Sequence, residues 1–231
     1  MTQPLPLVTA QYRAGFAEPR PEAAALRSGR DWPLGNSTTI CSMDLRGWDK
    51  CYRSPQPPEA APARLLIETA KALVPGKALD LACGTGRNAL WLAGQGWKVT
   101  AVDGAAAGIE ILQRHAAIEG VTVETRVADL ETGEYIIEPS GWDLIVMSYY
   151  LQRDLFEPAK RGVVPGGIVL AIVHTAETGE EPSYKRLRPG ELRRYFEGWE
   201  ILHHYEGRPK DPAHQRAVAE IVARRPARET L

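Results

Sequence analysis

Two acidic residues beside a glycine-rich turn are the part of this 231-residue chain best suited to chemistry. Asp80 precedes the turn, Gly84 and Gly86 lie within it, and Asp103 follows further along the chain. The glycines allow backbone torsions and a close ligand approach that a Cβ would obstruct. A carboxylate at Asp103 can accept hydrogen bonds from both hydroxyls of a ribose. The spacing therefore predicts a nucleoside pocket.

Two strands and a helix must position these residues. The apolar run at 77–81 predicts a short strand that carries Asp80. Residues 88–94 predict a helix with its apolar side chains on one face, so its free N–H groups would lie beside the glycine turn. Residues 98–102 predict a second strand, which Asp103 closes. A helix start in this place attracts negative or electron-rich groups.

Two classes of ligand fit this turn. Gly84, Gly86 and Ala89 also satisfy the G-x-G-x-x-A pattern of dinucleotide-binding proteins, with Asp103 as the acid. Asp80 separates the classes, because its carboxylate would repel a pyrophosphate but suits a cationic ligand with an amino-acid group. S-adenosylmethionine carries both a sulfonium and an ammonium. An ordinary glycine loop, with Asp103 capping the next helix, is the alternative.

The stretch Asp80-Leu-Ala-Cys-Gly-Thr-Gly86 resembles the first motif of the class I S-adenosylmethionine-dependent methyltransferases, and Asp103 resembles their ribose-binding acid. Trp48-Asp49 and Tyr52 are similar to small bacterial tellurite-resistance-type methyltransferases, as are the Gly-Thr-Gly-Arg-Asn turn and the Phe-Glu-Gly-Trp-Glu ending. The resemblance covers roughly residues 45 to 225. Ala82 stands where the first glycine of the motif is common, and we expect this small side chain to interfere only weakly.

The resemblance implies an α/β fold: a Rossmann-like, doubly wound, mostly parallel sheet of seven strands with a C-terminal antiparallel hairpin. Runs at 121–127 and 142–148 predict further strands, and 164–173 predicts a Pro-Gly-Gly turn that leads into a fifth. Residues 191–204 and 214–224 predict a helix and two more strands. The implied cofactor is S-adenosyl-L-methionine. Ala128-Asp129-Leu130 is the implied adenine site, although an aspartate there is also a common turn residue. The residues expected at the cofactor are Trp48, Tyr52, Asp80, Ala82, Cys83, Gly84, Gly86, Arg87, Asn88, Asp103, Gly104, Ala128, Asp129, Leu130, Met147 and Ser148.

The methyl acceptor is expected at the carboxyl ends of the strands at 142–148 and 164–173, where α/β folds bind ligands. Methyl transfer from a sulfonium is an in-line displacement, so the protein mainly aligns the nucleophile with the methyl carbon. A thiol, selenol or metalloid oxyanion is already nucleophilic near neutral pH, which makes a strong base optional. The residues expected to line this pocket are Ser148, Tyr149, Tyr150, Gln152, Arg153 and His174, of which His174, Tyr149 and Arg153 are the catalytic candidates.

Several of these residues have structural alternatives. His174 is the best base by type, because it titrates near neutrality, but a histidine that ends a strand is often structural. Arg153 could hold an anionic acceptor with its planar donor fork, while the adjacent Asp154 suits a helix start. Cys83 lies in the glycine turn, where a helix N-terminus could lower its pKa, but inert packing is the favoured interpretation.

Composition fits one globular enzyme domain, with 44% hydrophobic and 25% charged residues. A formal net charge of −1 gives no broad basic field, so nucleic acid is not expected as a substrate. Cys41, Cys51 and Cys83 lack metal-ligand spacing, and His203 and His204 should point to opposite faces of one strand, so no metal site is expected. The cysteines favour a reducing cytoplasm. No targeting or membrane-spanning segment is recognisable.

The first 44 residues differ from the rest, because prolines are spread among Ala, Arg and Glu without periodicity. We expect a loosely ordered arm at 1–44 and a methyltransferase domain at 45–231. Trp48 and Tyr52 are expected to fold over the cofactor mouth and exclude water; the alternative is that Trp48 packs as ordinary core. Residues 62–73 predict an amphipathic helix that covers one sheet face.

The sequence favours a methyltransferase acting on a small-molecule acceptor that is a soft nucleophile, such as a thiol or a metalloid oxyanion. A short-chain NAD(P)-dependent oxidoreductase would need a Tyr-x-x-x-Lys pair, and none of the eight tyrosines has a lysine four residues later. A non-catalytic S-adenosylmethionine-binding protein would keep the two aspartates and the glycines but block the acceptor pocket. That alternative stays open at the level of sequence.

Overall fold

The computed structural model describes residues 44–54, 61–177, 179–209 and 216–227. The chain divides after Ser37, and all of these residues belong to the second unit, Thr38–Leu231. Apart from Asp44, the N-terminal arm expected at residues 1–44 lies outside the described residues.

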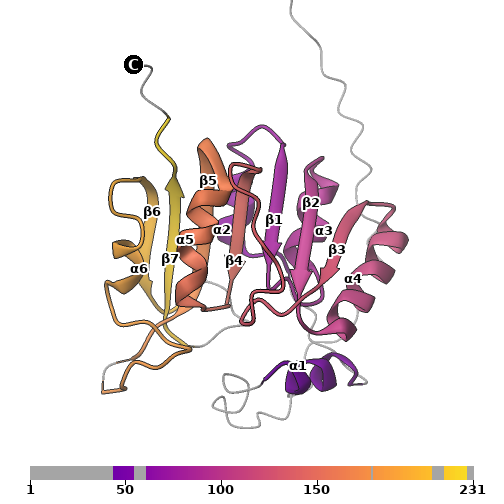
Figure 1. The fold of residues 1–231 in the computed structure, drawn as a ribbon, viewed down its shortest axis with the longest axis horizontal. Helices are drawn as coiled ribbons and strands as arrows, with labels where there is room; N and C mark the ends of the chain where they lie inside the picture. Colours follow the sequence, from indigo (N-terminus) through magenta and orange to yellow (C-terminus); the bar gives the residue numbers. More distant parts are fainter. Residues whose placement is uncertain (1–43, 55–60, 178, 210–215, 228–231) are drawn as a thin grey trace, which may run out of the picture. The chain divides into compact units, whose positions relative to one another are not determined.

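A seven-stranded sheet forms the centre of the unit, in the order β3-β2-β1-β4-β5-β7-β6 (Figure 1). The first five strands along the chain pair in parallel, whereas β7 runs antiparallel to both β5 and β6. The order reverses between β1 and β4, which places the topological switch point at their carboxyl ends. This arrangement confirms the predicted fold class. The strands are β1 (Lys77–Leu81), β2 (Lys98–Asp103), β3 (Val123–Val127), β4 (Trp142–Ser148), β5 (Val163–His174), β6 (Glu200–Gly207) and β7 (Val218–Arg224).

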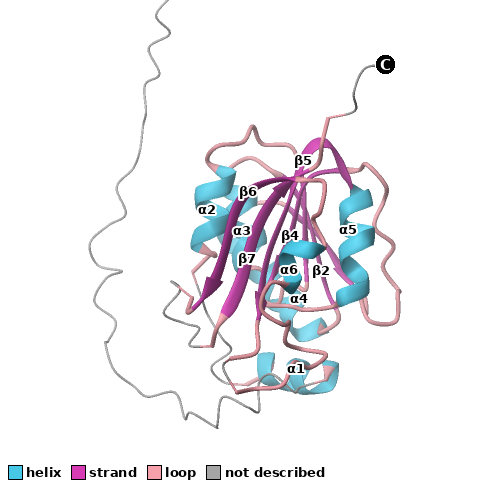
Figure 2. Cartoon of the chain, turned by 90° about the vertical axis from the view of Figure 1, so that its left-hand side faces the viewer, coloured by secondary structure: helices cyan, strands magenta, loops and turns pink. Residues whose placement is uncertain are grey.

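Helices cover both faces of the sheet, as Figure 2 shows. Apolar side chains of α2, α3 and α4 pack on one face, and those of α5 and α6 pack on the other. A further helix, α1, lies beyond the carboxyl ends of the parallel strands (Figure 1). The helices are α1 (Leu45–Tyr52), α2 (Arg64–Ala70), α3 (Arg87–Gly94), α4 (Ala106–Glu119), α5 (Phe156–Gly162) and α6 (Glu191–Arg194), with a 3-10 turn at Arg153–Leu155 before α5.

The side chains of β1 show how the strand pattern places the site. Leu79 and Leu81 pack into the cluster on the α5 side, and Ala78 packs into the cluster under α3. Successive side chains of a strand alternate between faces, so Asp80 shares the α3 face with Ala78. The one carboxylate of this strand is thereby placed beneath the first turn of α3.

Several element boundaries differ from the sequence prediction. Trp48 and Tyr52 belong to the helix α1, which the sequence did not predict, and the helix expected at 62–73 is shortened to α2. The Pro-Gly-Gly segment expected as a turn before the fifth strand lies inside β5, where the register with β4 shifts. Pro165 cannot donate to the sheet ladder, which explains an irregularity at this point.

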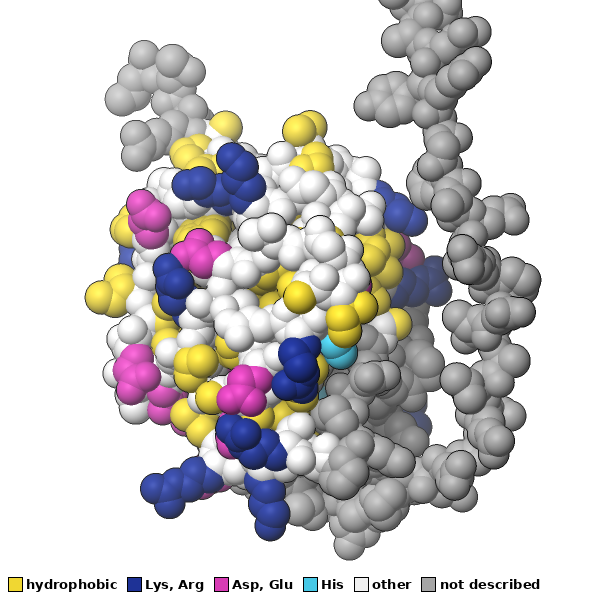
Figure 3. All heavy atoms as spheres, turned by 90° about the vertical axis from the view of Figure 1, so that its right-hand side faces the viewer, with side chains coloured by type: hydrophobic (Ala, Val, Ile, Leu, Met, Phe, Trp, Pro, Cys, Tyr) yellow, Lys and Arg dark blue, Asp and Glu magenta, His cyan; other side chains and the backbone are white. Residues whose placement is uncertain are grey.

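The surface carries charges of both signs. Figure 3 shows Lys and Arg side chains interspersed with Asp and Glu over the face formed by α4 and β3, in keeping with the net charge of −1. Within the described ranges, no helix combines the length and the apolar character needed to cross a bilayer.

Candidate functional site

The turn between β1 and α3 follows an unusual backbone path. Ala82, Gly84 and Gly86 have φ angles of +54°, +56° and +86°, in the left-handed region that favours glycine. A Cβ at Gly86 would stand 2.3 Å from the Leu112 side chain of α4. Gly86 is also the N-cap of α3 and supplies no side-chain cap. The N–H groups at the start of α3 therefore have no capping side chain from Gly86.

Asp103 holds this turn from the end of β2. Its Oδ2 accepts a hydrogen bond from the Gly84 N–H at 2.7 Å, and its Oδ1 accepts one from the Ala105 N–H at 2.8 Å. Burial raises the pKa of Asp103, and the two N–H donors oppose that rise. Each carboxylate oxygen has a second lone pair. The carboxylate is therefore oriented by the backbone and keeps acceptor capacity for two hydroxyls.

Asp80 is a buried acid at the switch point, with only 1% of its surface exposed. Its Oδ2 has no hydrogen-bond partner among the described residues. Burial raises the pKa of Asp80 to about 7, although the nearby positive charge of Arg87 lowers it. A backbone hydrogen bond from Ala89 also favours the ionised form, but Oδ2 is buried without a hydrogen-bond donor, so this site suits a cationic ligand.

The first two residues of α3 hold the segment that leads into α2. Asn88 Oδ1 accepts a buried hydrogen bond from the Ala63 N–H at 2.9 Å, and Arg87 Nη1 donates to the Ala61 carbonyl at 3.1 Å. The Asn88 side chain is therefore engaged within the fold, and we no longer assign it to the cofactor. Arg87 also lies over the Tyr149 ring, 5.2 Å from its centroid, so it faces the acceptor half of the site.

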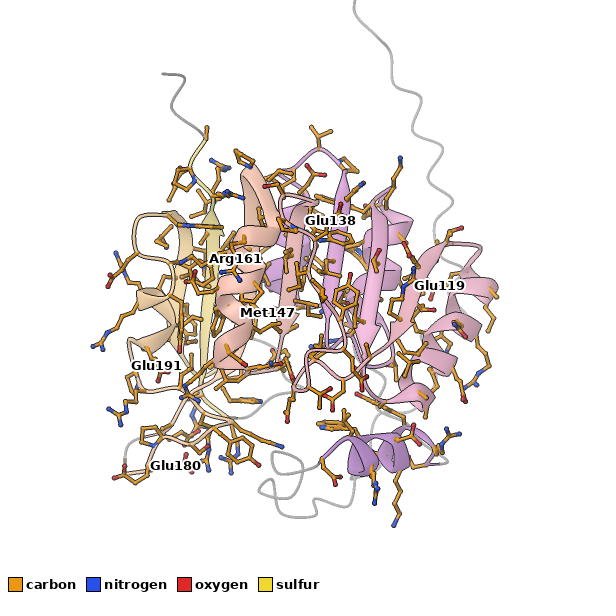
Figure 4. The ribbon with its side chains drawn as sticks, in the orientation of Figure 1. Glu119, Glu138, Met147, Arg161, Glu180 and Glu191 are labelled. Atoms are coloured by element: carbon orange, nitrogen blue, oxygen red, sulfur yellow. The ribbon has the colours of Figure 1, made fainter. Side chains whose placement is uncertain are left out.

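Three residues expected at the cofactor belong to the apolar core. Met147, in the middle of the sheet (Figure 4), is 1% exposed, and Ala128 and Leu130 are also buried in the cluster on the α5 side. Met147 faces the core because side chains alternate along β4. We therefore assign it to the support of the site rather than to its lining.

Asp129 forms part of a tight turn. Its Oδ1 accepts from the Glu131 N–H at 2.9 Å, and its own N–H donates to Glu134 Oε2 at 2.9 Å. The neighbouring Ala128 N–H donates to the Asp103 carbonyl at 3.1 Å. Asp129 is thus a turn residue, which is the alternative that the sequence left open. The hydrogen bond of Ala128 places the loop after β3 directly beside the end of β2.

Cys83 is buried within the glycine turn and 8% exposed. Burial raises its pKa well above the ordinary value for a thiol, with the charges of Asp80 and Asp103 acting in the same direction. The alternative in which the helix N-terminus lowers this pKa is wrong. Cys83 is a packing residue.

Helix α1 docks on the start of α4 through one carboxylate. Asp49 Oδ1 accepts from the Ala107 N–H at 2.9 Å, and its Oδ2 accepts from Arg53 Nε at 2.7 Å. The Leu45 side chain occupies the space beside Gly104, where a Cβ would stand 2.5 Å from it. Gly104 therefore makes room for α1.

Tyr52 lies directly on the glycine turn. A Cβ at Gly84 would stand 2.7 Å from its hydroxyl oxygen, and a Cβ at Gly108 would stand 3.1 Å from its ring. Trp48 stacks on Tyr52 with the ring centroids 5.7 Å apart. No residue of α1 is fully buried, so the alternative of Trp48 as an ordinary core residue is wrong. The two aromatic rings meet over the predicted cofactor mouth.

The acceptor half of the site contains Ser148, Tyr149 and His174. Ser148 Oγ is buried and has no hydrogen-bond partner among the described residues. Tyr149 has a φ of +61°, and its ring lies 5.7 Å from that of His174. Burial lowers the pKa of His174, a backbone hydrogen bond at Ala217 opposes this shift, and the charges of Arg216 and Arg186 add to it. His174 is therefore a neutral imidazole near pH 7.

Arg153 is engaged by the loop that precedes α6. Its Nε donates to Glu191 Oε1 at 2.7 Å, and its two terminal nitrogens donate to the carbonyls of Ser183, Tyr184 and Arg186. Glu191 stands at the start of α6 (Figure 4). Because the guanidinium fork is directed at this loop, we reassign Arg153 from acceptor binding to loop positioning.

The structure adds contacts that the sequence interpretation did not assign. Arg186 and Arg216 lie near enough to His174 to influence its pKa, and Asp49 docks α1. Arg186 belongs to the basic run at 185–188, which is a signal visible in the sequence. The partners of Asp49 and Arg216 are distant in the chain and have no such signal.

No group of three or more His, Cys, Asp or Glu residues able to hold a metal occurs in the part of the chain that the structure describes. His203 Nε2 lies 2.9 Å from Glu220 Oε2, and His204 Nε2 lies 3.4 Å from Glu206 Oε1. The two histidines thus contact different glutamates.

Known proteins resemble this chain in sequence. A family model described as "Tellurite resistance protein TehB" matches residues 61–210. Hemagglutinin 1 of Eikenella corrodens is 29% identical over 147 residues, covering 60% of this chain and 49% of that protein. A probable S-adenosyl-L-methionine-dependent methyltransferase TehB of Haemophilus influenzae is 29% identical over 153 residues, covering 61% and 52%. The chain spans about half the length of these curated relatives.

The fold is also similar to a solved member of that family. The crystal structure of TehB from Haemophilus influenzae superposes with a TM-score of 0.61 at 24% identity, covering 78% of this chain and 66% of that chain. The family model and the Haemophilus influenzae relative, together with this fold, confirm the resemblance to class I methyltransferases of the tellurite-resistance type. Because the family model matches more than half of its residues, this chain belongs to the TehB family of tellurite resistance proteins.

Proposed function

We propose that this protein is an S-adenosylmethionine-dependent methyltransferase that acts on a small, soft nucleophile. One observation carries the proposal. Asp80 is a buried acid whose Oδ2 has no partner among the described residues, and it lies beside a glycine turn held by Asp103. Asp80 suits the cationic amino-acid part of this cofactor, and Asp103, at the same edge of the sheet, suits its ribose.

The residues at the carboxyl ends of β1 and β2 fit the cofactor. Asp103 would accept from the ribose hydroxyls, and the turn around Gly84 would lie against the nucleoside because it has no Cβ there. Asp80 would face the amino-acid portion with its charge. The loop at 128–130 would adjoin the adenine. The name of the Haemophilus influenzae relative, a probable S-adenosyl-L-methionine-dependent methyltransferase, supports the same assignment.

Helix α1 would cover the bound cofactor. Tyr52 lies on the glycine turn and Trp48 stacks on Tyr52, so the two rings would exclude water from the transferred methyl group. Gly104 and Gly108 leave the space that α1 occupies. These contacts support the assignment of Trp48, Tyr52 and Gly104 to the cofactor site.

Three arginines border the acceptor half. Arg186 and Arg216 influence His174 and share Glu180 as an ion-pair partner, and Arg87 lies over Tyr149. Cationic groups favour an anionic nucleophile, such as a thiolate or a metalloid oxyanion. We infer that the acceptor enters beside Tyr149 and His174, with Ser148 Oγ as a further hydrogen-bonding group.

The proposed reaction needs alignment more than activation. The bound cofactor supplies an electrophilic methyl group on a positively charged sulfur. In this in-line displacement, a lone pair of the acceptor would form the new bond to carbon while the carbon–sulfur bond breaks, and the electron pair of the broken bond would remain on sulfur. Tyr149 would orient the acceptor, and neutral His174 could take the proton of an acceptor that arrives protonated.

Calorimetry tests the cofactor assignment. We expect S-adenosylmethionine and S-adenosylhomocysteine to bind and NADH not to bind, because Asp80 repels a pyrophosphate. Binding of NADH with neither of the others would contradict the proposal. Transfer of a labelled methyl group to small thiols, selenite, tellurite and heteroaromatic thiols then tests catalysis. Cofactor binding without any product would favour a non-catalytic binding protein.

A further inference from the structure

Two consecutive tyrosines at the end of β4 face opposite sides of the sheet. Tyr149 packs against the apolar cluster under α2 and α3, whereas Tyr150 packs against the cluster on the α5 side. Tyr149 has a left-handed backbone with φ of +61°, which is rare for a bulky residue. Its N–H still donates to the Ile172 carbonyl at 2.6 Å. The chain is therefore held in the conformation that separates the two rings.

Tyr150 reaches the half of the site that we assign to the nucleoside. Burial raises the pKa of its hydroxyl, and the charges of Glu131, Asp129 and Asp103 raise it further. These acids belong to the loop after β3 and to the end of β2. The hydroxyl is therefore protonated at neutral pH and acts as a hydrogen-bond donor.

Gln152 connects Tyr150 to that same loop. The Tyr150 hydroxyl donates to Gln152 Oε1 at 2.8 Å, and Gln152 Nε2 donates to the Leu130 carbonyl at 3.0 Å, both partly buried. A carbonyl can only accept, so the amide nitrogen must face Leu130, and the amide oxygen is left for the tyrosine. Both ends of one amide are thus used, and its orientation is determined by its partners.

We propose that Gln152 is a positioning residue that fastens the loop after β4 to the loop after β3 and holds the Tyr150 hydroxyl toward the nucleoside. Tyr150 and Gln152, which the sequence placed in the acceptor pocket, then serve the cofactor, and Tyr149 serves the acceptor. The inference rests on the proposed function. Because the Tyr150 oxygen donates its proton to Gln152, its lone pairs remain to accept from a nucleoside amine or hydroxyl.

The two hydrogen bonds of the Gln152 amide form a bridge from Tyr150 to Leu130. This bridge also links the two halves of the site. The loop after β3 contains Asp129 and Leu130, and the loop after β4 contains Tyr149 and leads to α5. A nucleoside that orders the first loop would order the second through Gln152, provided that the amide makes both bonds. Cofactor binding should therefore precede and improve acceptor binding.

Two substitutions break the bridge at different bonds. Gln152→Glu keeps an acceptor for Tyr150 but places a carboxylate against the Leu130 carbonyl, and Tyr150→Phe keeps the ring but removes the donor. We expect each to raise the Kd of S-adenosylhomocysteine about five- to tenfold. The loss should appear more strongly in the KM for the cofactor than in kcat, since the bridge acts on cofactor binding. The double variant should have a Kd for S-adenosylhomocysteine close to that of the single variant that binds it more weakly, because the two substitutions act through the same amide.

Matched controls come from the same residue types elsewhere. Gln113 Nε2 donates to Thr125 Oγ1 at 2.8 Å on the outer side of α4, and the Tyr195 hydroxyl lies 3.4 Å from Glu191. Gln113→Glu and Tyr195→Phe should bind S-adenosylhomocysteine like the wild type. Wild-type affinity in Gln152→Glu and Tyr150→Phe would overturn the inference, as would equal losses in the controls. A wild-type protein that binds no S-adenosylhomocysteine would instead overturn the proposed function.

Discussion

Asp103 and Gly84 are joined by a 2.7 Å hydrogen bond from the Gly84 N–H to Asp103 Oδ2. The acid proposed for the ribose therefore also holds the glycine turn that would receive the nucleoside. Its second oxygen accepts from Ala105 at the start of the chain leading into α4. One carboxylate thus sets the relative positions of three segments before any ligand binds.

Asp103→Ala should weaken the binding of S-adenosylhomocysteine by about 1 to 3 kcal/mol, because charge-assisted hydrogen bonds to the ribose are lost. Calorimetry on both proteins measures the difference. Asp143→Ala is the matched control, since Asp143 Oδ2 accepts from the Lys77 N–H at 2.7 Å at the other end of β1. Unchanged affinity in Asp103→Ala would show that the ribose assignment is wrong.

The local part of the site could be predicted from sequence, because strand, turn, helix and strand follow each other within one stretch of chain. Asp80, Gly84 and Asp103 lie where the spacing places them. Asn88 shows the limit. It stands in the same motif, but its partner is the Ala63 N–H, 25 residues away, and no local pattern specifies that contact.

Cofactor affinity should depend on pH through Asp80. Burial raises the pKa of this carboxyl to about 7 in the free protein, whereas a cationic ligand favours the ionised form. Below pH 7 the group must lose a proton before the ligand binds, so the Kd of S-adenosylmethionine should rise as the pH falls, by up to about tenfold per unit. Above pH 7 the contribution of Asp80 levels off.

Asp80→Asn isolates this effect from the titration of the ligand itself. Calorimetry at pH 6, 7 and 8 should give a pH dependence in the wild-type protein that is smaller in the variant. The variant should also bind more weakly at pH 8, because it lacks the negative charge. Parallel pH profiles for the two proteins would rule out Asp80 as the titrating group.

Ala82→Gly should stabilise the protein by about 1 kcal/mol, because a Cβ is strained at a φ of +54°. Urea denaturation measures the free energy of unfolding. Ala117, exposed in the last part of α4, provides a control of opposite sign, since Ala117→Gly should cost about 1 kcal/mol in a helix. A loss of stability in Ala82→Gly would mean that the methyl group makes contacts worth more than the strain.

Helix α1 is the element that sequence could predict least. Only eight residues long and without a fully buried residue, it is too short to be stable alone. Asp44 caps its start by accepting from the Gly47 N–H at 2.8 Å, and Asp49 docks it on Ala107, 58 residues further along the chain. The function of Arg153 is equally hard to predict, because the carbonyls to which it donates belong to residues 183–186, about 30 positions further along the chain. Contacts between distant segments decide the function of such residues.

Asp49→Ala should release α1 and speed the dissociation of S-adenosylhomocysteine about fivefold, since one hydrogen bond to the Ala107 N–H is lost. Stopped-flow experiments that follow Trp48 fluorescence measure this rate. Asp49→Asn keeps the Oδ1 acceptor and should restore most of the wild-type behaviour. Equal dissociation rates in the wild-type protein and Asp49→Ala would show that α1 does not cover the cofactor.

His174 should matter only for acceptors that carry a proton. Burial and the charges of Arg216 and Arg186 lower its pKa, so it is neutral at pH 7 and can accept a proton. His174→Gln should lower the rate with a protonated thiol about 100-fold, but should change the rate little with an acceptor that is already anionic. In the wild-type protein the thiol reaction should slow as the pH falls below the lowered pKa, since protonated His174 cannot act as a base. His115→Gln, on α4, is the control, and equal losses with both kinds of acceptor would assign His174 to the shape of the pocket instead of to proton transfer.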